Sequence, residues 1–90
     1  MGEHTKGPWQ TGRHLRDAKN GGDFVILLAH GRWIGDLRCN DDEDDANVKL
    51  IAAAPDLLEA CEAYYYGRKE NRECEAMMRA AIAKATGVAT

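Results

Sequence analysis

Cys39 and His30 are the two residues of this 90-residue chain whose types could together form a nucleophilic pair, because an imidazole can accept the proton of a thiol. The apolar segments on either side of His30 predict a β-hairpin over residues 24–38. A tight turn in this hairpin places Cys39 beyond Phe24, at the opposite end from His30. His14 does not complete a zinc site, since the chain lacks C-x-x-C and H-x-x-x-H spacing. We therefore expect no enzymatic activity, no catalytic residue, no metal and no cofactor.

Five consecutive carboxylates form the most strongly charged segment of the chain: Asp41, Asp42, Glu43, Asp44 and Asp45. They do not form an EF-hand loop, because the D-x-D-x-D-G spacing is missing. One interpretation is a helix start, where one aspartate caps the helix and the others favour the positive end of its dipole. The other is a cation site or a recognition surface for a basic partner, since closely packed carboxylates repel one another. The five acids are therefore candidate partner-binding residues.

The overall charge argues against some classes of function. The chain has 12 Lys and Arg residues, 15 Asp and Glu residues and a net charge of −3. Outside the run of acids the two signs are nearly balanced, so the basic face typical of nucleic-acid-binding proteins is missing. No segment approaches the roughly 20 apolar residues of a membrane span, and the N-terminus has no signal-peptide core. We expect a cytoplasmic protein whose partner is neither nucleic acid nor membrane.

The pattern of apolar residues predicts an α+β fold in a single small domain, residues 1–90, with frayed ends at 1–7 and 88–90. The sheet is expected to contain an N-terminal strand around Trp9, at residues 8–13, and the two strands of the hairpin, at 24–29 and 32–38. Two to three C-terminal helices are expected to pack against it.

The longest regular segment, residues 47–66, has apolar residues at i, i+3, i+4 and i+7, as an amphipathic helix does. Pro55 interrupts it. Proline costs roughly 3 kcal/mol inside a helix but almost nothing at the first position of a new one. We therefore predict two helices, at about 43–53 and 55–66, bent at Ala54. The alternative is one gently kinked helix, because the apolar stripe stays almost in phase. A last helix is predicted at about 69–86, ended by Gly87.

A type I′ turn at His30-Gly31 would pair Leu28 with Trp33, Ile26 with Gly35 and Phe24 with Leu37. These pairs assign side chains to the two faces of the sheet, because side chains alternate along a strand. The predicted core face contains five large apolar residues: Phe24, Ile26, Leu28, Trp33 and Leu37. The opposite face includes Val25, Leu27 and Ile34. This face is too apolar for a surface that is fully exposed to water. These three residues are therefore candidates for self-association, in a homodimer for example, unless the N-terminal segment covers them.

Three residues after the long apolar stripe form a second candidate contact surface. Tyr66 projects away from the stripe, and Arg68 and Lys69 follow it closely. Tyrosine and arginine are enriched at protein interfaces. These residues are therefore candidate partner-binding residues, together with the run of acids.

Two segments carry a resemblance to a known family: HTKGPW at residues 4–9 and DDANVKLIAAAPDLLEA at residues 44–60. The chain resembles a family of small uncharacterised proteins of tailed bacteriophages and prophages. Members begin with His-x-x-Gly-Pro-Trp and contain a segment of the form A-N-x-x-L-I-A-A-A-P-[DE]-L-L-E-A. The resemblance implies a phage or prophage origin and expression in a bacterial cytoplasm. It implies no activity and no catalytic residues.

Two classes of function are compatible with these observations. The first is a non-enzymatic binding protein that acts on a host or phage macromolecule. Because a basic face is missing, we expect this macromolecule to be a protein. Inhibition of a host defence, in the manner of anti-CRISPR proteins, is one form of this function. The alternative is a homo-oligomeric structural or accessory phage protein.

Overall fold

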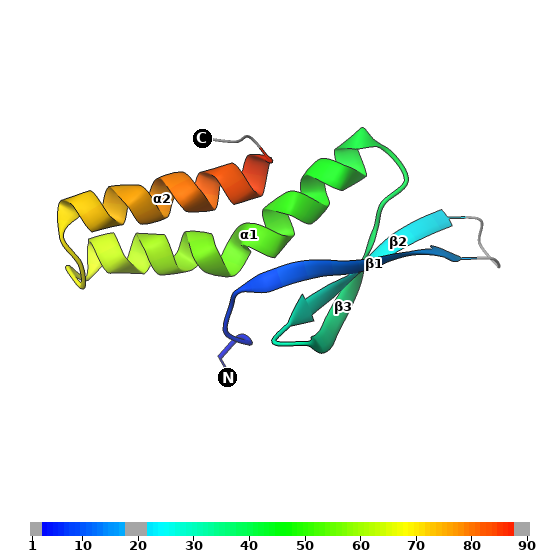
Figure 1. Ribbon diagram of the computed structural model, residues 1–90, viewed down its shortest axis with the longest axis horizontal. Helices are drawn as coiled ribbons and strands as arrows, with labels where there is room; N and C mark the ends of the chain where they lie inside the picture. The colour runs from blue at the N-terminus through cyan, green and yellow to red at the C-terminus, as the bar shows by residue number, and fades with distance from the viewer. Residues whose placement is uncertain (1–2, 18–21, 88–90) are drawn as a thin grey trace.

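The computed structural model describes residues 3–17 and 22–87. Within these ranges the chain forms three strands and two helices (Figure 1): β1 (Trp9–Asp17), β2 (Gly22–Ala29), β3 (Arg32–Arg38), α1 (Asp42–Tyr65) and α2 (Asn71–Thr86). The strands make an antiparallel sheet in the order β1-β2-β3. The α+β class and the antiparallel sheet are therefore confirmed. Of the predicted frayed ends, 1–7 and 88–90, residues 1–2 and 88–90 lie outside the described residues.

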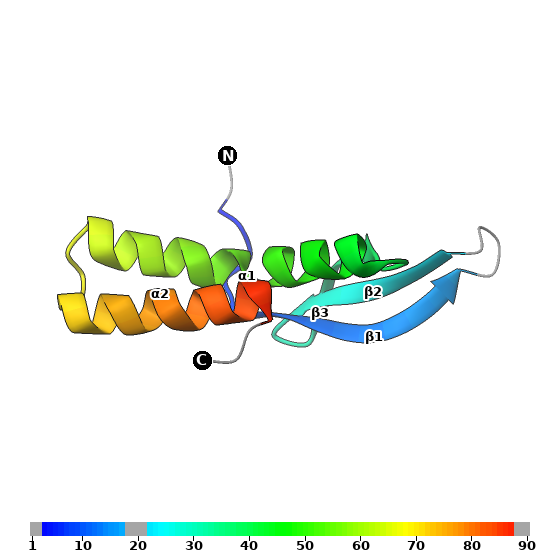
Figure 2. The ribbon, with the colours of Figure 1, turned by 90° about the horizontal axis from the view of Figure 1, so that it is seen from above.

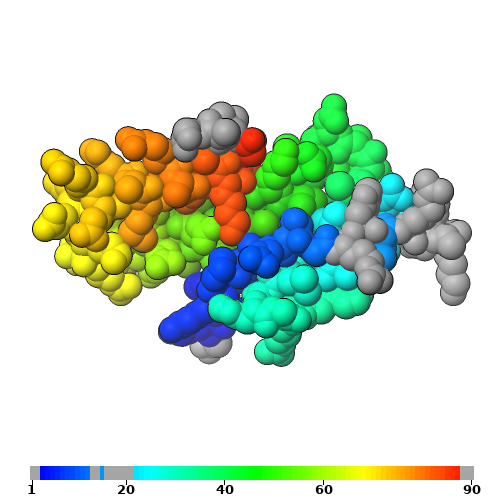
Figure 3. Space-filling model, viewed as in Figure 1, coloured from blue at the N-terminus to red at the C-terminus, as the bar shows by residue number. Residues whose placement is uncertain are grey.

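The molecule is elongated, with extents of 50 × 32 × 20 Å. The first half of α1 lies over the sheet, and its second half continues beyond the sheet beside the antiparallel α2 (Figures 1 and 2). The yellow and orange parts of α1 and α2 accordingly extend past the strands in the space-filling view (Figure 3). The protein thus has a proximal part made of sheet and helix and a distal part made of helices.

The β2–β3 hairpin turns at His30 and Gly31, which have φ angles of 55° and 78°. Positive φ at both positions is the property of the predicted type I′ turn, and Leu28 pairs with Trp33 as expected. The register then shifts, because Leu27 pairs with Gly35 and Ile34 is left over as a β-bulge. The pairs predicted farther along, Ile26 with Gly35 and Phe24 with Leu37, are therefore wrong by one residue.

The helix-covered face of the sheet is the reverse of the predicted one. Val25, Leu27 and Ala29 are 8%, 5% and 1% exposed, whereas Trp33 is 56% exposed. The other members of the predicted core face on β2 are only half-buried: Phe24, Ile26 and Leu28. Leu37 is also half-buried, but it pairs with Val25 and so shares the covered face. Because both faces are apolar, alternation along the strand could not show which one the helix covers.

This reversal also corrects the predicted self-association surface. Val25 and Leu27 lie beneath α1, which contacts both outer strands and so crosses this face of the sheet. The third member, Ile34, is half-buried at the bulge. The face that stays uncovered in a single chain is the one with Trp33.

Pro55 lies inside one continuous helix, so the prediction of two helices bent at Ala54 is wrong and the kinked-helix alternative is correct. Figure 1 shows α1 changing direction near its middle. A proline removes one backbone hydrogen bond and crowds the preceding turn. Here the Pro55 ring is buried, which recovers part of that cost.

The two helices approach each other through small side chains rather than through the large residues of the predicted stripe. In α1 the buried residues Ala53, Ala60 and Ala63 are at most 3% exposed. In α2 Cys74 and Ala81 are 0% and 2% exposed. Four large residues of α1 are exposed instead: Leu50 at 53%, Leu58 at 43%, Tyr64 at 61% and Tyr65 at 80%. The core between the helices is therefore thin, and one apolar face of α1 faces solvent.

Candidate functional site

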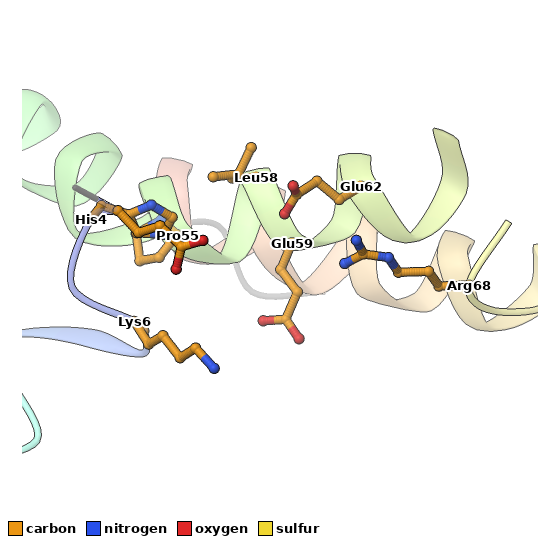
Figure 4. Close-up of a pocket in the computed structure, with 9 residues that line it drawn as sticks. His4, Lys6, Pro55, Leu58, Glu59, Glu62 and Arg68 are labelled. Carbon is orange, nitrogen blue, oxygen red and sulfur yellow. The ribbon is translucent and has the colours of Figure 1, made fainter. Parts of the chain in front are cut away.

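A groove runs between the N-terminal segment and the second half of α1 (Figure 4). Its volume is about 790 Å3. Its walls come from the segment before β1, from one side of α1 and from the first residues after α1: Glu3, His4, Lys6, Gly7, Pro55, Leu58, Glu59, Glu62 and Arg68. We refer to it as the N-terminal groove.

Close contact between Gly7 and Pro55 closes one end of this groove. A Cβ atom placed on Gly7 would lie 2.9 Å from the Cβ atom of Pro55, which is closer than such atoms approach in proteins. The indole N–H of Trp9 donates to the carbonyl oxygen of Thr5 at 2.9 Å, which folds the segment back on itself. The rings of His4 and Trp9 also meet edge to face, with centroids 6.4 Å apart. A glycine at position 7 is thus what lets the segment lie against the helix.

The groove combines an apolar base with charges of both signs. Pro55 and Leu58 supply apolar surface, while Glu59 and Glu62 project from α1 beside them. The side chain of Arg68 extends from the opposite end toward these carboxylates in Figure 4. Such a lining suits a polypeptide segment that offers apolar groups together with charged or amide groups, more than it suits a phosphate, which two carboxylates would repel.

The distal turn, residues 66–70 between the helices, brings aromatic and basic side chains together next to the groove. The rings of Tyr65 and Tyr66 meet edge to face with centroids 5.0 Å apart. The guanidinium carbon of Arg68 lies 5.2 Å from the centre of the Tyr66 ring. Lys69 lies in the same turn, 4.0 Å from the carboxylate of Glu73. Tyr66, Arg68 and Lys69, which the sequence grouped together, are therefore neighbours in space.

A family model described as Salmonella phage P22 protein Y8K6 matches residues 1–89. The chain belongs to this family. Searches for similar curated proteins and similar solved structures found no match.

Membership of this family confirms that the chain is a phage-family protein, as the resemblance implied. In this family member the two segments that carried the resemblance meet in space, because Gly7 of the first contacts Pro55 of the second. The groove lies at this meeting point. Sequence reasoning did not assign the N-terminal segment to a site, although the joint occurrence of the two segments was a signal that they are neighbours.

The run of acids in this phage protein forms the beginning of α1. The carboxylate of Asp41 accepts a hydrogen bond from the backbone N–H of Asp44 at 2.8 Å. The Asp44 carboxylate in turn accepts one from the backbone N–H of Asn40 at 3.1 Å. Asp45 forms an ion pair of 3.0 Å with Lys49. Asp41 is therefore the N-cap of α1, and Asp44 binds the residue before the cap. The helix-start interpretation, together with the ion pair of Asp45, accounts for three of the five carboxylates.

The two halves of the predicted partner-binding surface do not come together within one chain. The acids from Asp41 to Asp45 start α1, whereas Tyr66, Arg68 and Lys69 follow its end. A 24-residue helix separates them, which is about 36 Å at 1.5 Å per residue. Asp42 and Glu43 are exposed, and their part in partner binding stays a prediction.

The reactive residues that the sequence singled out lie apart. His30 is in the β2–β3 turn, whereas Cys39 follows β3 at the other end of the hairpin, with its backbone N–H 2.9 Å from the carbonyl oxygen of Asp23. The side chain of His14 lies outside the described part of the structure. Desolvation raises the pKa of the Cys39 thiol, and the carboxylates of Asp45 and Asp44 raise it further.

No group of three or more His, Cys, Asp or Glu side chains within residues 3–17 and 22–87 is arranged to hold a metal ion. Neither helix in these ranges combines the length and the apolar character needed to cross a membrane.

Proposed function

We propose that this phage protein is a non-enzymatic binding protein that acts on a host or phage protein in the bacterial cytoplasm. The observation that carries the proposal is the exposed cluster of Tyr65, Tyr66 and Arg68 beside the N-terminal groove. Aromatic and arginine side chains supply most of the binding energy in many protein interfaces. Tyr65 and Tyr66 are 80% and 62% exposed, so neither contributes its full apolar area to the fold of the single chain.

The chemistry of the groove favours a protein partner. A segment of the partner would place apolar groups on Pro55 and Leu58 and pair its charged or amide groups with Glu59 and Glu62. The stacked Tyr66 and Arg68 at the end of the groove would then contact the partner's surface. Inhibition of a host-defence complex, as anti-CRISPR proteins achieve it, is one concrete form of this function.

The binding function is tested by capture followed by affinity measurement. Tagged protein is incubated with a bacterial lysate, retained proteins are identified, and the affinity of each purified candidate is measured by calorimetry. Tyr66→Ala and Glu62→Lys should each weaken binding at least about tenfold, because truncation of an interface anchor commonly costs 2 kcal/mol or more. Arg38→Ala on β3 serves as the control and should change the dissociation constant less than twofold. Equal affinities for all four proteins would contradict the proposal.

Host-defence inhibition has its own test. A bacterium with an active CRISPR system is infected with a targeted phage while it expresses the protein. If the protein inhibits this defence, the phage should plate with at least tenfold higher efficiency, and Tyr66→Ala should abolish the gain. An unchanged plating efficiency would contradict this form of the function, whereas the affinity measurements test binding itself.

The second candidate function is a homo-oligomeric structural or accessory role. One observation favours it, namely the exposed large apolar residues of α1, where Leu50, Leu58 and Tyr64 are 53%, 43% and 61% exposed.

A further inference from the structure

One wall of the N-terminal groove is backbone that leaves its hydrogen-bonding groups open. None of the backbone N–H groups of residues 3–7 donates a hydrogen bond to another residue in the described ranges. The carbonyl oxygen of Thr5 accepts from the Trp9 indole, and no other carbonyl oxygen of this segment accepts a hydrogen bond from a described residue. Unpaired main-chain groups along a segment are a template on which an extended polypeptide can pair. This wall can therefore recognise the main chain of a bound segment.

The groove also contains charged side chains without partners. Glu59 and Glu62 are three residues apart on α1, so they are neighbours on its surface. Neither forms a hydrogen bond or an ion pair with a residue in the part of the chain that the structure describes, and the same is true of Glu3 and Lys6 on the N-terminal segment. With Arg68, the lining holds three carboxylates and two basic groups. The excess of negative charge favours an occupant that brings a basic group.

Leu58 and Glu62 offer such a group both an apolar and a charged contact. They lie one helical turn apart on α1; Leu58 is 43% exposed, and Glu62 is half-buried. In Figure 4 the Glu62 carboxylate lies on the side of Leu58. Arg68 is stacked on the Tyr66 ring and forms no ion pair with Glu62. Lysine and arginine bury an apolar stem while keeping their charged end in polar surroundings, so one such side chain satisfies both residues.

We propose that the N-terminal groove binds an extended segment of the protein partner, paired through its main chain with residues 3–7. The segment carries a lysine or arginine whose stem lies on Leu58 and whose charged group binds Glu62. Addition of a strand in this way takes affinity from main-chain hydrogen bonds and specificity from side-chain sites. A helical segment satisfies its own main chain and would leave residues 3–7 unpaired. The inference rests on the proposed function in one respect, since it takes the partner to be a protein.

Selection from a peptide library tests the chemistry of the occupant without knowledge of the partner. Random seven-residue peptides displayed on yeast are selected against the purified protein. The retained sequences should share a lysine or arginine at one position, beside residues that favour extended backbone. Retained sequences without a common basic position, or with aspartate or glutamate there, would overturn the proposal.

Affinities of the best synthetic peptide locate the basic side chain. Glu62→Gln should raise the dissociation constant at least about tenfold, because a charge-assisted hydrogen bond is lost. Glu62→Lys should instead bind the peptide that has glutamate at the basic position. Glu75→Gln is the matched control, because Glu75 is an exposed glutamate on α2, and it should leave the affinity unchanged. Circular dichroism should show equal helix content in all variants. A Glu62→Gln variant with the original affinity would overturn the assignment.

Methylation of the peptide backbone tests the extended conformation. Successive N–H groups of a strand point to opposite edges, so methylation of every second nitrogen should weaken binding at least about tenfold and methylation of the others much less. A period of three to four residues, or helical circular dichroism of the bound peptide, would show a helix and overturn the pairing. In NMR spectra the amide signals of residues 4–7 should shift on binding, and unchanged signals there would have the same consequence.

These results can be told apart from a failure of the proposed function. The peptide selection uses the purified protein alone, whereas the proposed function is tested on a partner captured from a lysate. If Tyr66→Ala weakens binding of a captured partner while no peptide depends on Glu62, the groove assignment falls and the binding function stands. Peptides that depend on Glu62 and pair as a strand support the groove even where no partner is captured.

Discussion

The Nζ atom of Lys84, near the end of α2, lies 2.8 Å from the Oδ2 atom of Asp56 in the middle of α1. The same ammonium group donates a hydrogen bond of 2.9 Å to the carbonyl oxygen of Trp9 at the start of β1. One side chain therefore connects both helices to the sheet at the point where the N-terminal groove begins. Because both partners of the ion pair are about two-thirds buried, this contact is screened less than a surface ion pair.

Replacement of Lys84 by methionine should destabilise the protein. The change keeps most of the apolar stem but leaves the Asp56 carboxylate and the Trp9 carbonyl without this donor. We expect a loss of about 1–2 kcal/mol in the free energy of unfolding, measured by urea denaturation. Lys49→Met is the control, since Lys49 pairs with Asp45 at the exposed surface, and it should cost less than about 0.5 kcal/mol. Equal losses in both variants would contradict the connecting role of Lys84.

The capping role of Asp41 predicts different effects for two adjacent aspartates. Asp41→Ala removes the acceptor for the backbone N–H of Asp44 and should cost about 1 kcal/mol. In a domain of this size that lowers the melting temperature by roughly 4–8 °C. Asp42→Ala removes an exposed carboxylate from the first turn and should change it far less. Thermal melts of the two variants at one protein concentration test this, and equal shifts would argue against a specific cap.

The close approach of the helices predicts that α1 does not tolerate added volume at its buried alanines. Ala60 is 1% exposed, so Ala60→Leu should force the helices apart and cost about 1–3 kcal/mol. Ala80→Leu adds the same atoms at an exposed position of α2 and should be nearly neutral. Chemical denaturation measures both, and a neutral Ala60→Leu would contradict the alanine contact.

Local sequence rules located most elements of this fold, because each depends on residues that are close in the chain. The His30-Gly31 turn, the carboxylate cap at Asp41 and the glycine after α2 have the expected conformations. Gly87 has a φ angle of 74°, as a helix-ending glycine should. Turn and cap geometry needs no knowledge of the tertiary structure.

The choice of buried faces could not be predicted in the same way. The sheet is apolar on both sides, and a single bulge at Ile34 shifts the pairing by one residue. In α1 the large residues of the apolar stripe pointed to a core, whereas the helices meet through alanines such as Ala60. Periodicity identifies apolar faces but does not tell which partner covers each one. The groove was missed for the same reason, since it depends on the distant contact between Gly7 and Pro55.

The contact between Gly7 and Pro55 predicts a local effect of adding a methyl group. A Cβ atom at position 7 would lie 2.9 Å from Pro55 Cβ, so Gly7→Ala should push the N-terminal segment away from α1. In a Trp33→Phe background Trp9 is the remaining tryptophan, and its fluorescence should shift toward the red as the indole becomes more hydrated. Gly35→Ala is the control, because nothing lies within 4 Å of the added atom. An unchanged Trp9 emission in Gly7→Ala would show that the segment does not depend on this contact.

The raised pKa of Cys39 predicts slow reaction with alkylating reagents. Desolvation and the carboxylates of Asp45 and Asp44 disfavour the thiolate, and the thiolate is the reactive form. Near pH 8 Cys39 should therefore react with iodoacetamide more slowly than a cysteine in an unstructured peptide, as followed by mass spectrometry of the digested protein. Its rate should continue to rise with pH beyond the range where the peptide rate levels off, because a higher pH is needed to remove the proton from the Cys39 thiol.

Asp45→Asn removes the largest of the charge effects on the pKa of Cys39 and should speed the reaction. Glu59→Gln, which lies far away on the second half of α1, should not change the rate. If Cys39 reacts as fast as the peptide, and Asp45→Asn does not change its rate, the assigned cause of the raised pKa is contradicted.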